Sequence, residues 1–179
     1  MKGFKSAKLR LAPVLDAAAR ASLARQLAER VLACLGQMWT VVVCDDEEVA
    51  EWATGHGARV AWTPGLGLSG AVTAGVSVAA AEGFELAVVT HADLPYAVGL
   101  DRLGEPGCVT LAPDVRRDGT NVAVVPSEAG FVFSYGKGSF ERHRAEAARL
   151  GLPCRIVHDR RLAIDVDLPE DLAGAGVAI

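Results

Sequence analysis

Three short apolar runs alternate with helical patterns in the first half of the sequence, and this alternation limits the possible folds more than any other feature. The runs are WTVVVC at 39–44, ARVAW at 58–62 and ELAVVT at 85–90. The spacing of apolar residues predicts a helix over 16–35 and further helices over 45–54 and 69–82. Strands that alternate with helices through short loops indicate a three-layer α/β fold with a mostly parallel sheet.

The second half of the sequence changes to strands that lie closer together. We expect strands at 108–112, 121–126, 131–133, 154–159 and 162–167. A helix over 139–150 and a short helix over 168–174, with proline in its first turn, complete the pattern. The composition has no break along the 179 residues, so we expect a single domain over 1–179.

Charge and apolar patterning exclude several classes of partner. The formal net charge is -4, so the composition lacks the excess of positive charge that is typical of nucleic-acid binding. No apolar run approaches the roughly 18 residues that a membrane span requires, and the basic N-terminal segment lacks the apolar core of a secretory signal. The 4 cysteines lie far apart without metal-ligand spacing, and we interpret them as buried reduced thiols of a cytoplasmic protein.

Carboxylates follow the apolar runs at two places. Ligands of open α/β sheets bind beyond the carboxyl ends of the strands. Asp93 follows the run 85–90, and Asp165 and Asp167 alternate within AIDVDLPED. Like charges this close need a cation or donors between them, and hard cations prefer carboxylate oxygens. We therefore expect a shared Mg²⁺ site, although Asp167 as an N-cap and Asp93 as a turn former are the alternatives.

Two segments would suit a nucleotide. Residues 1–10 contain a cluster of cations suited to a triphosphate, with a frayed basic terminus as the alternative. These cations are Lys2, Lys5, Lys8 and Arg10. The glycine-rich PGLGLSG segment leads into a helix near Ser69, and bare backbone there could approach a base or a phosphate. Its spacing fits neither the Walker loop nor the dinucleotide fingerprint, so this motif alone is a weak indication.

Two segments of the second half combine glycine with a hydroxyl side chain. APDVRRDGTNVAVVP places Thr120 directly after a predicted turn, in which Gly119 is expected to accept a positive φ. FSYGKGSFERH places Gly136 and Gly138 around a lysine, with Ser139 at a helix start, where free backbone amides form an anion site. The alternatives are a plain turn and an ordinary serine N-cap.

The histidines carry little information in the sequence. His143 lies one turn inside the helix that begins near Ser139, and it either faces the same site or lies on the surface. We interpret His56, His91 and His158 as structural or solvated.

Six segments together resemble the phosphoenolpyruvate/2-phospholactate guanylyltransferase family of deazaflavin coenzyme F-420 biosynthesis. They are KGFKSAKLRLAPVL, GLGLSGAV, ADLP, APDVRRDGTNVAVV, FSYGKGSFERH and AIDVDLPEDL, and they cover essentially the whole chain. The last four are specific in their order and spacing. The resemblance implies a nucleotidyltransferase fold similar to the glycosyltransferase-A group. It also implies that GTP is joined to a small phosphorylated three-carbon acid, with Mg²⁺ as cofactor and pyrophosphate as the second product.

The resemblance implies a role for each residue that matches the family motifs. The implied metal ligands are Asp93, Asp165 and Asp167. The implied phospho-acid ligands are Thr120, Gly136 and Ser139. The implied triphosphate ligands are Lys2, Lys8 and Arg10. Guanine is expected to dock on the loop 67–70, through Gly67, Ser69 and Gly70. The implied catalytic set is Lys8, Arg10 and Asp93.

The sequence departs from the family pattern at two places. Family members begin with an apolar strand ahead of the Lys2 and Gly3 pair, and residues 1–15 contain no strand pattern, as a start codon assigned too late would explain. The base loop usually reads Leu-Asn-Ala where this chain has Leu68, Ser69 and Gly70. A molybdopterin-type nucleotidyltransferase and a catalytically inactive nucleotide-binding module are therefore the alternative functions.

The sequence also leaves two properties open. The acid substrate is phosphoenolpyruvate, 2-phospho-L-lactate or 3-phosphoglycerate, which share a phosphate and a carboxylate. The oligomeric state is undetermined, a homodimer being one option.

Overall fold

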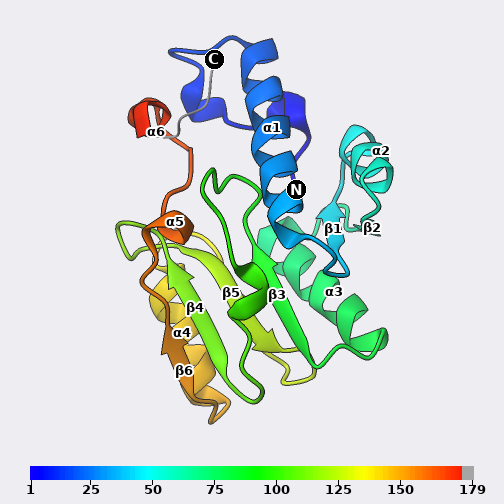
Figure 1. Cartoon of the computed structure of the whole chain (residues 1–179), viewed down its shortest axis with the longest axis vertical. Helices are drawn as coiled ribbons and strands as arrows, with labels where there is room; N and C mark the ends of the chain where they lie inside the picture. Colours follow the sequence, from blue (N-terminus) through cyan, green and yellow to red (C-terminus); the bar gives the residue numbers. More distant parts are fainter. Residues whose placement is uncertain (175–179) are drawn as a thin grey trace.

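Six strands form two separate sheets within residues 1–174, the part of the chain that the computed structural model describes (Figure 1). The smaller sheet pairs β1 (Val41–Cys44) with β2 (Arg59–Trp62) in parallel. The larger sheet has the order β3-β5-β4-β6. Its strands are β3 (Leu86–Thr90), β5 (Thr120–Pro126), β4 (Val109–Pro113) and β6 (Cys154–Ile156). Only β5 runs against the other strands of this sheet, because it is antiparallel to β3 and β4 whereas β6 is parallel to β4.

Apart from α5, which the sequence did not predict, the helices follow the predicted order. They are α1 (Ala17–Leu35), α2 (Glu47–Gly55), α3 (Gly67–Ala81), α4 (Ser139–Arg149), α5 (Arg160–Ala163) and α6 (Pro169–Gly174). Short 3-10 turns occur at η1 (Phe4–Ser6), η2 (Leu9–Leu11) and η3 (Leu100–Arg102). The carboxylate of Asp16 accepts the Ala19 N–H at 2.8 Å and that of Asp46 accepts the Val49 N–H at 3.1 Å, so both residues cap a helix. None of the described helices is long and apolar enough to cross a membrane.

Side chains on the two faces of the larger sheet belong to different apolar clusters. Leu111 of β4 packs in a cluster that contains Phe140 of α4. The adjacent Ala112 packs on the other face, in a cluster with Val31 of α1 and Leu162 of α5. Because successive strand side chains point to opposite faces, the sheet is covered on both sides. The three-layer arrangement predicted from the sequence is confirmed (Figure 1).

No strand precedes β1 in the described residues, in agreement with the sequence pattern. The strands β1 and β3 do not pair with each other. An apolar cavity of about 330 Å³ lies between them, with Val41 and Val43 on one side and Leu86 and Val88 on the other. The Met1 ammonium donates a hydrogen bond to the carbonyl oxygen of Val43 at the edge of β1. This gap is what separates the two sheets.

The predicted strand at 131–133 is wrong. Phe131 and Phe133 are buried and Val132 is exposed, as the alternation of a strand requires. However, the Val132 N–H donates to the Glu146 carboxylate at 2.9 Å, and this segment is part of neither sheet. The pattern correctly indicates which side chains are buried. However, the Glu146 carboxylate, and not the backbone of a neighbouring strand, accepts the hydrogen bond of the Val132 N–H.

The predicted strand at 162–167 is also wrong. The carboxylate of Asp159 accepts the Arg161 N–H at 2.9 Å and starts the short helix α5. After α5 the chain is irregular, and the Val166 N–H donates to the Asp93 carbonyl oxygen at 3.3 Å. This bond brings the segment with Asp165 and Asp167 next to the loop that follows β3.

The turn between β4 and β5 forms where the sequence predicts it, for a different reason. The Asp114 carboxylate accepts the N–H groups of Asp118 at 2.9 Å and Gly119 at 2.8 Å. The positive φ of this turn is that of Arg117, at 56°, and not that of Gly119. A Cβ at position 119 would lie 2.7 Å from Asp114 Oδ2. Glycine is therefore needed for close approach to a carboxylate.

The cysteines are only partly buried, in contrast to the prediction. Cys44 and Cys108 are buried, whereas Cys34 is half-buried and Cys154 is exposed. Cys154 begins β6, the edge strand of the larger sheet, which leaves one side of that strand without a neighbour.

Truncating Leu111 to Ala should destabilise the fold by about 2–5 kcal/mol, because the cavity left in a fully packed layer is only partly closed by relaxation. Val115 in the nearby turn is 68% exposed and serves as the matched control. We expect Val115→Ala to change the free energy of unfolding by less than about 0.5 kcal/mol. Urea denaturation of the two variants measures both values. Equal losses would show that the layer around Leu111 is not the core of the domain.

Candidate active site

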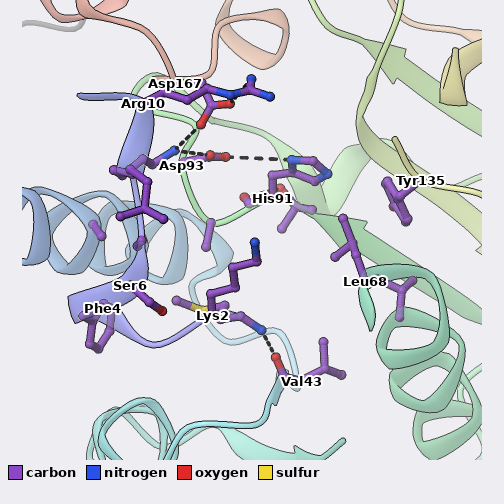
Figure 2. A pocket seen from close by; sticks show the side chains of 18 of the residues that line it. Lys2, Phe4, Ser6, Arg10, Val43, Leu68, His91, Asp93, Tyr135 and Asp167 are labelled. Atoms are coloured by element: carbon purple, nitrogen blue, oxygen red, sulfur yellow. Dashed lines mark hydrogen bonds and ion pairs between the residues drawn. The ribbon is translucent and has the colours of Figure 1, made fainter. Parts of the chain in front are cut away.

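A cavity of about 430 Å³ opens between the N-terminal segment and the loop that follows β3 (Figure 2). Charged residues gather at one end of it, where Arg10, Asp93 and Asp167 lie close together. Leu68 and Tyr135 lie at the other end. All five residues line the cavity, so it has a charged end and a largely apolar end.

Lys8 connects the two carboxylates at the charged end. It adopts a left-handed backbone conformation with φ 55° at the start of η2, and its side chain is only 7% exposed. Its ammonium donates to Asp93 Oδ2 and, at 3.3 Å, to Asp167 Oδ1. Arg10 Nη1 donates to Asp167 Oδ2 at 3.1 Å. A buried ammonium is stable here because two anions offset the cost of removing it from water.

The carboxylates at this end shift one another's pKa. Burial raises the pKa of Asp93, but the positive charge of Lys8 and its hydrogen bond, with a contribution from the neighbouring His91, more than offset this, and the pKa lies below its ordinary value. Burial, together with the negative charges of Asp93 and Asp167, raises the pKa of Asp165. The three carboxylates predicted to bind metal therefore influence one another electrostatically.

The described residues do not bring these carboxylates together as a ready metal site. No group of three His, Cys, Asp or Glu side chains within residues 1–174 is placed to hold a metal ion. The Lys8 ammonium contacts Asp93 and Asp167 in the position where a shared cation would lie. Asp165 does not line the cavity.

His91 and Tyr135 line the cavity although the sequence alone assigns neither a role. The His91 Nδ1 lies 3.9 Å from Asp93 Oδ1. In the part of the chain that is described, His91 Nε2 and the Tyr135 hydroxyl are buried without a hydrogen-bond partner. Burial raises the pKa of Tyr135, which therefore stays protonated as a donor. His91 directly follows β3, so the rule that identified Asp93 could also have identified it.

The glycine-rich loop contributes one side chain to the cavity. The helix α3 begins at Gly67, two residues before its predicted start. Among residues 67–70 only Leu68 lines the cavity. The Ser69 Oγ accepts the N–H of Tyr135 at 2.9 Å. This bond holds the start of α3 against the loop that precedes α4.

Thr120 and Ser139 are brought together, and both are buried outside the lining of this cavity. The Thr120 N–H donates to Ser139 Oγ at 3.1 Å. Ser139 is not the N-cap of α4, because Gly138 holds that position without a side-chain bond. The Ser139 N–H donates to the Gly136 carbonyl oxygen at 2.9 Å. The Phe140 N–H donates to the Asp118 carbonyl oxygen at 3.1 Å, so the helix start has at least two free amides fewer than the sequence predicts.

A cluster of cations and carboxylates beside the carboxyl end of β3, in a three-layer α/β fold, is an arrangement suited to nucleotidyl transfer. The fold is similar to a solved structure from Desulfovibrio desulfuricans G20 that carries the name nucleotide-diphospho-sugar transferase. The TM-score is 0.78 over 96% of this chain and 81% of that chain, at 17% identity. This likeness shows the fold.

The chain belongs to the family described as guanylyl transferase CofC like, which matches residues 1–175. It is 36% identical to the phosphoenolpyruvate guanylyltransferase of Rubrobacter xylanophilus over 97% of this chain and 89% of that protein. It is 35% identical to the enzyme of the same name from Sphaerobacter thermophilus, over 94% of this chain and 86% of that protein. It is 32% identical to the 3-phospho-D-glycerate guanylyltransferase of Phenylobacterium zucineum, over 96% of this chain and 84% of that protein.

Replacing Lys8 with Met removes the cation that lies between Asp93 and Asp167. We expect the melting temperature of this variant to fall in buffer with EDTA and to recover in millimolar Mg²⁺, because a dication can replace the ammonium between like charges. The wild-type protein should gain much less from Mg²⁺. Lys5→Met is the matched control, since Lys5 is 87% exposed and contacts neither carboxylate. A melting temperature of Lys8→Met that does not change when Mg²⁺ is added would show that these carboxylates form no cation site.

Proposed function

We propose that this protein is a guanylyltransferase that joins GTP to a small phosphorylated three-carbon acid and releases pyrophosphate, in the biosynthesis of coenzyme F-420. The observation that carries the proposal is the charged end of the cavity, where Lys8 and Arg10 meet Asp93 and Asp167. The family match supports this reaction over a molybdopterin-type transfer. The relatives are named as enzymes, which favours turnover over an inactive nucleotide-binding module.

The triphosphate of GTP would bind the cations of the N-terminal segment. Lys2 and Arg10 line the cavity, and the Arg10 side chain is 71% exposed, so its guanidinium can turn toward a phosphate. Guanine would dock at the apolar end, against Leu68 and Tyr135. The backbone around Gly67, Ser69 and Gly70 would approach the base there.

The residues present fit a hard dication. Asp93 Oδ1 is buried without a hydrogen-bond partner in the described chain, and Asp165 and Asp167 share its electrostatic environment. We propose that Asp93, Asp165 and Asp167 hold Mg²⁺ when the nucleotide displaces the Lys8 ammonium. The ion would neutralise charge on the phosphates during transfer.

The phospho-acid would bind near Thr120, Gly136 and Ser139. Relatives named for phosphoenolpyruvate and for 3-phospho-D-glycerate both act on a compound that carries one phosphate and one carboxylate. Hydroxyl and backbone donors recognise such anions without distinguishing the carbon skeleton. We propose phosphoenolpyruvate as the first acid to test, because the relatives with 36% and 35% identity carry its name.

The chemical step needs no nucleophilic side chain. A phosphate oxygen of the acid attacks the α-phosphorus of GTP and forms a new P–O bond. The bond from the α-phosphorus to the oxygen that bridges to the β-phosphate breaks, and pyrophosphate leaves with the electron pair. The attacking phosphate is already anionic near neutral pH, so no base is required. Lys8 and Arg10 would hold the triphosphate in line and offset its charge.

We also propose where the enzyme acts, and we name the measurement that would determine its oligomeric state. GTP and small phospho-acids are metabolites of the cytoplasm, so we place the reaction there. Sedimentation of the purified protein would decide between a monomer and a homodimer.

Incubation with GTP, Mg²⁺ and each of the three acids should give a guanosine diphospho-acid with at least one of them, identified by mass spectrometry. Asp93→Asn and Asp165→Asn should each lower the rate about 100-fold or more, because each removes a proposed ligand of the Mg²⁺ that would offset the charge on the transferring guanylyl group. Asp101→Asn is the matched control, since Asp101 is exposed and does not line the cavity. Wild-type rates in both the Asp93→Asn and Asp165→Asn variants would contradict the metal assignment, and no product with any acid would contradict the proposed function.

A further inference from the structure

His143 is buried in a way that determines its protonation. The side chain lies one turn inside α4 and is 0% exposed. The Ser134 N–H lies 3.0 Å from its Nε2. A backbone amide can only donate, so Nε2 must be the unprotonated acceptor. Burial, together with the positive charge of Arg142, lowers the pKa of His143 to about 4. At neutral pH the ring is therefore neutral and carries its proton on Nδ1.

The protonated nitrogen points to Thr120. The His143 Nδ1 lies 3.0 Å from Thr120 Oγ1, so its N–H donates to the hydroxyl oxygen. The Ser139 Oγ accepts in the same way, from the Thr120 N–H at 3.1 Å. Each hydroxyl oxygen thus accepts one hydrogen bond from an N–H group and keeps its own O–H as a donor. Within residues 1–174, neither O–H donates a hydrogen bond in the structure.

Two hydroxyls whose O–H groups are still free to donate match a ligand that can only accept. Phosphate and carboxylate oxygens are such acceptors, whereas a hydroxyl that already donates inside the protein would offer them a lone pair instead. We propose that His143 is a positioning residue, which directs the Thr120 hydroxyl toward an oxygen of the bound phospho-acid. This inference rests on the proposed function.

The same ring also joins the two segments that would surround the acid. Its Nε2 holds Ser134, which precedes the glycines of the loop, and its Nδ1 holds Thr120 at the start of β5. Tyr135, which lines the cavity, packs edge-on against His143 with 5.0 Å between ring centroids. A change at His143 can therefore reach the acid site through Thr120 or through packing, and the experiment must separate the two routes.

Two substitutions each keep one of the two hydrogen bonds of the His143 ring and remove the other. In His143→Gln the amide carbonyl can still accept the Ser134 N–H, but the donor to Thr120 is lost. In His143→Asn the amide N–H₂ can still donate to Thr120, but the acceptor for Ser134 is lost. KM for phosphoenolpyruvate, KM for GTP and kcat are measured for both variants, for Thr120→Val and for the His143→Gln/Thr120→Val double variant.

We expect His143→Gln to raise KM for the acid about tenfold, as the loss of one aligned hydrogen bond to an anion predicts, and to change KM for GTP less than about twofold. His143→Asn should restore most of the acid affinity. Thr120→Val should raise KM for the acid more than KM for GTP. In the Thr120→Val background, His143→Gln should have almost no further effect on the acid, because its route through the hydroxyl is gone.

Three results overturn the inference while leaving the proposed function intact. They are an active wild type with an unchanged His143→Gln variant, equal losses in His143→Gln and His143→Asn, and a full additional effect of His143→Gln in the Thr120→Val background. Absence of product from the wild type overturns the proposed function and this inference with it. Nitrogen-15 NMR of the wild-type histidine needs no variant to fold. We expect the Nδ1–H tautomer, and the Nε2–H tautomer would overturn the inference.

Discussion

The ion contact of Lys8 with Asp93 and Asp167 is the interaction on which the rest of the cavity depends. Lys8 lies 85 residues from Asp93 and 159 residues from Asp167, so this single ammonium joins the N-terminal segment, the loop after β3 and the segment after α5. The two anions make its burial favourable. The ammonium in turn offsets the repulsion between the Asp93 and Asp167 carboxylates, which would otherwise push the two loops apart. Together with the buried side chains of Phe4 and Leu11, this contact holds the cations of the first ten residues beside the carboxyl end of β3.

A second, uncharged set of contacts shapes the opposite end of the cavity. Ser69 at the start of α3 accepts the Tyr135 N–H, and the His143 ring holds both Thr120 and the residue before Tyr135. Backbone amides and neutral side chains make these bonds, so they persist whatever ion or nucleotide occupies the charged end. The cavity thus combines a charged end that a ligand can rearrange with a neutral end that is already ordered. This division suits an enzyme that must bind a flexible triphosphate and a small rigid acid.

Much of the local structure follows from neighbouring residues. Asp16 and Asp46 precede apolar helical patterns and do cap α1 and α2, because a cap needs only a carboxylate three residues before a free N–H. The strands up to β5 were predictable because apolar β-branched runs suit a sheet that is covered on both faces. The segments 131–133 and 162–167 show the limit of this reasoning. Buried and exposed side chains alternate only in 131–133, and the partners of the N–H groups of Val132 and Val166 are Glu146 and Asp93, which no local pattern identifies.

By itself, the sequence determined the layers of the fold, the family, and the carboxylate and hydroxyl residues that are candidate ligands, because propensity, periodicity and motif spacing depend on near neighbours. Only the tertiary structure decided how these residues meet. It placed Lys8 between Asp93 and Asp167, and it brought His143 to Thr120 across 23 residues. The direction of a hydroxyl proton and the cation that a carboxylate faces depend on atoms from distant segments. Such contacts exist only once the chain has folded, and here they determine what the site can bind.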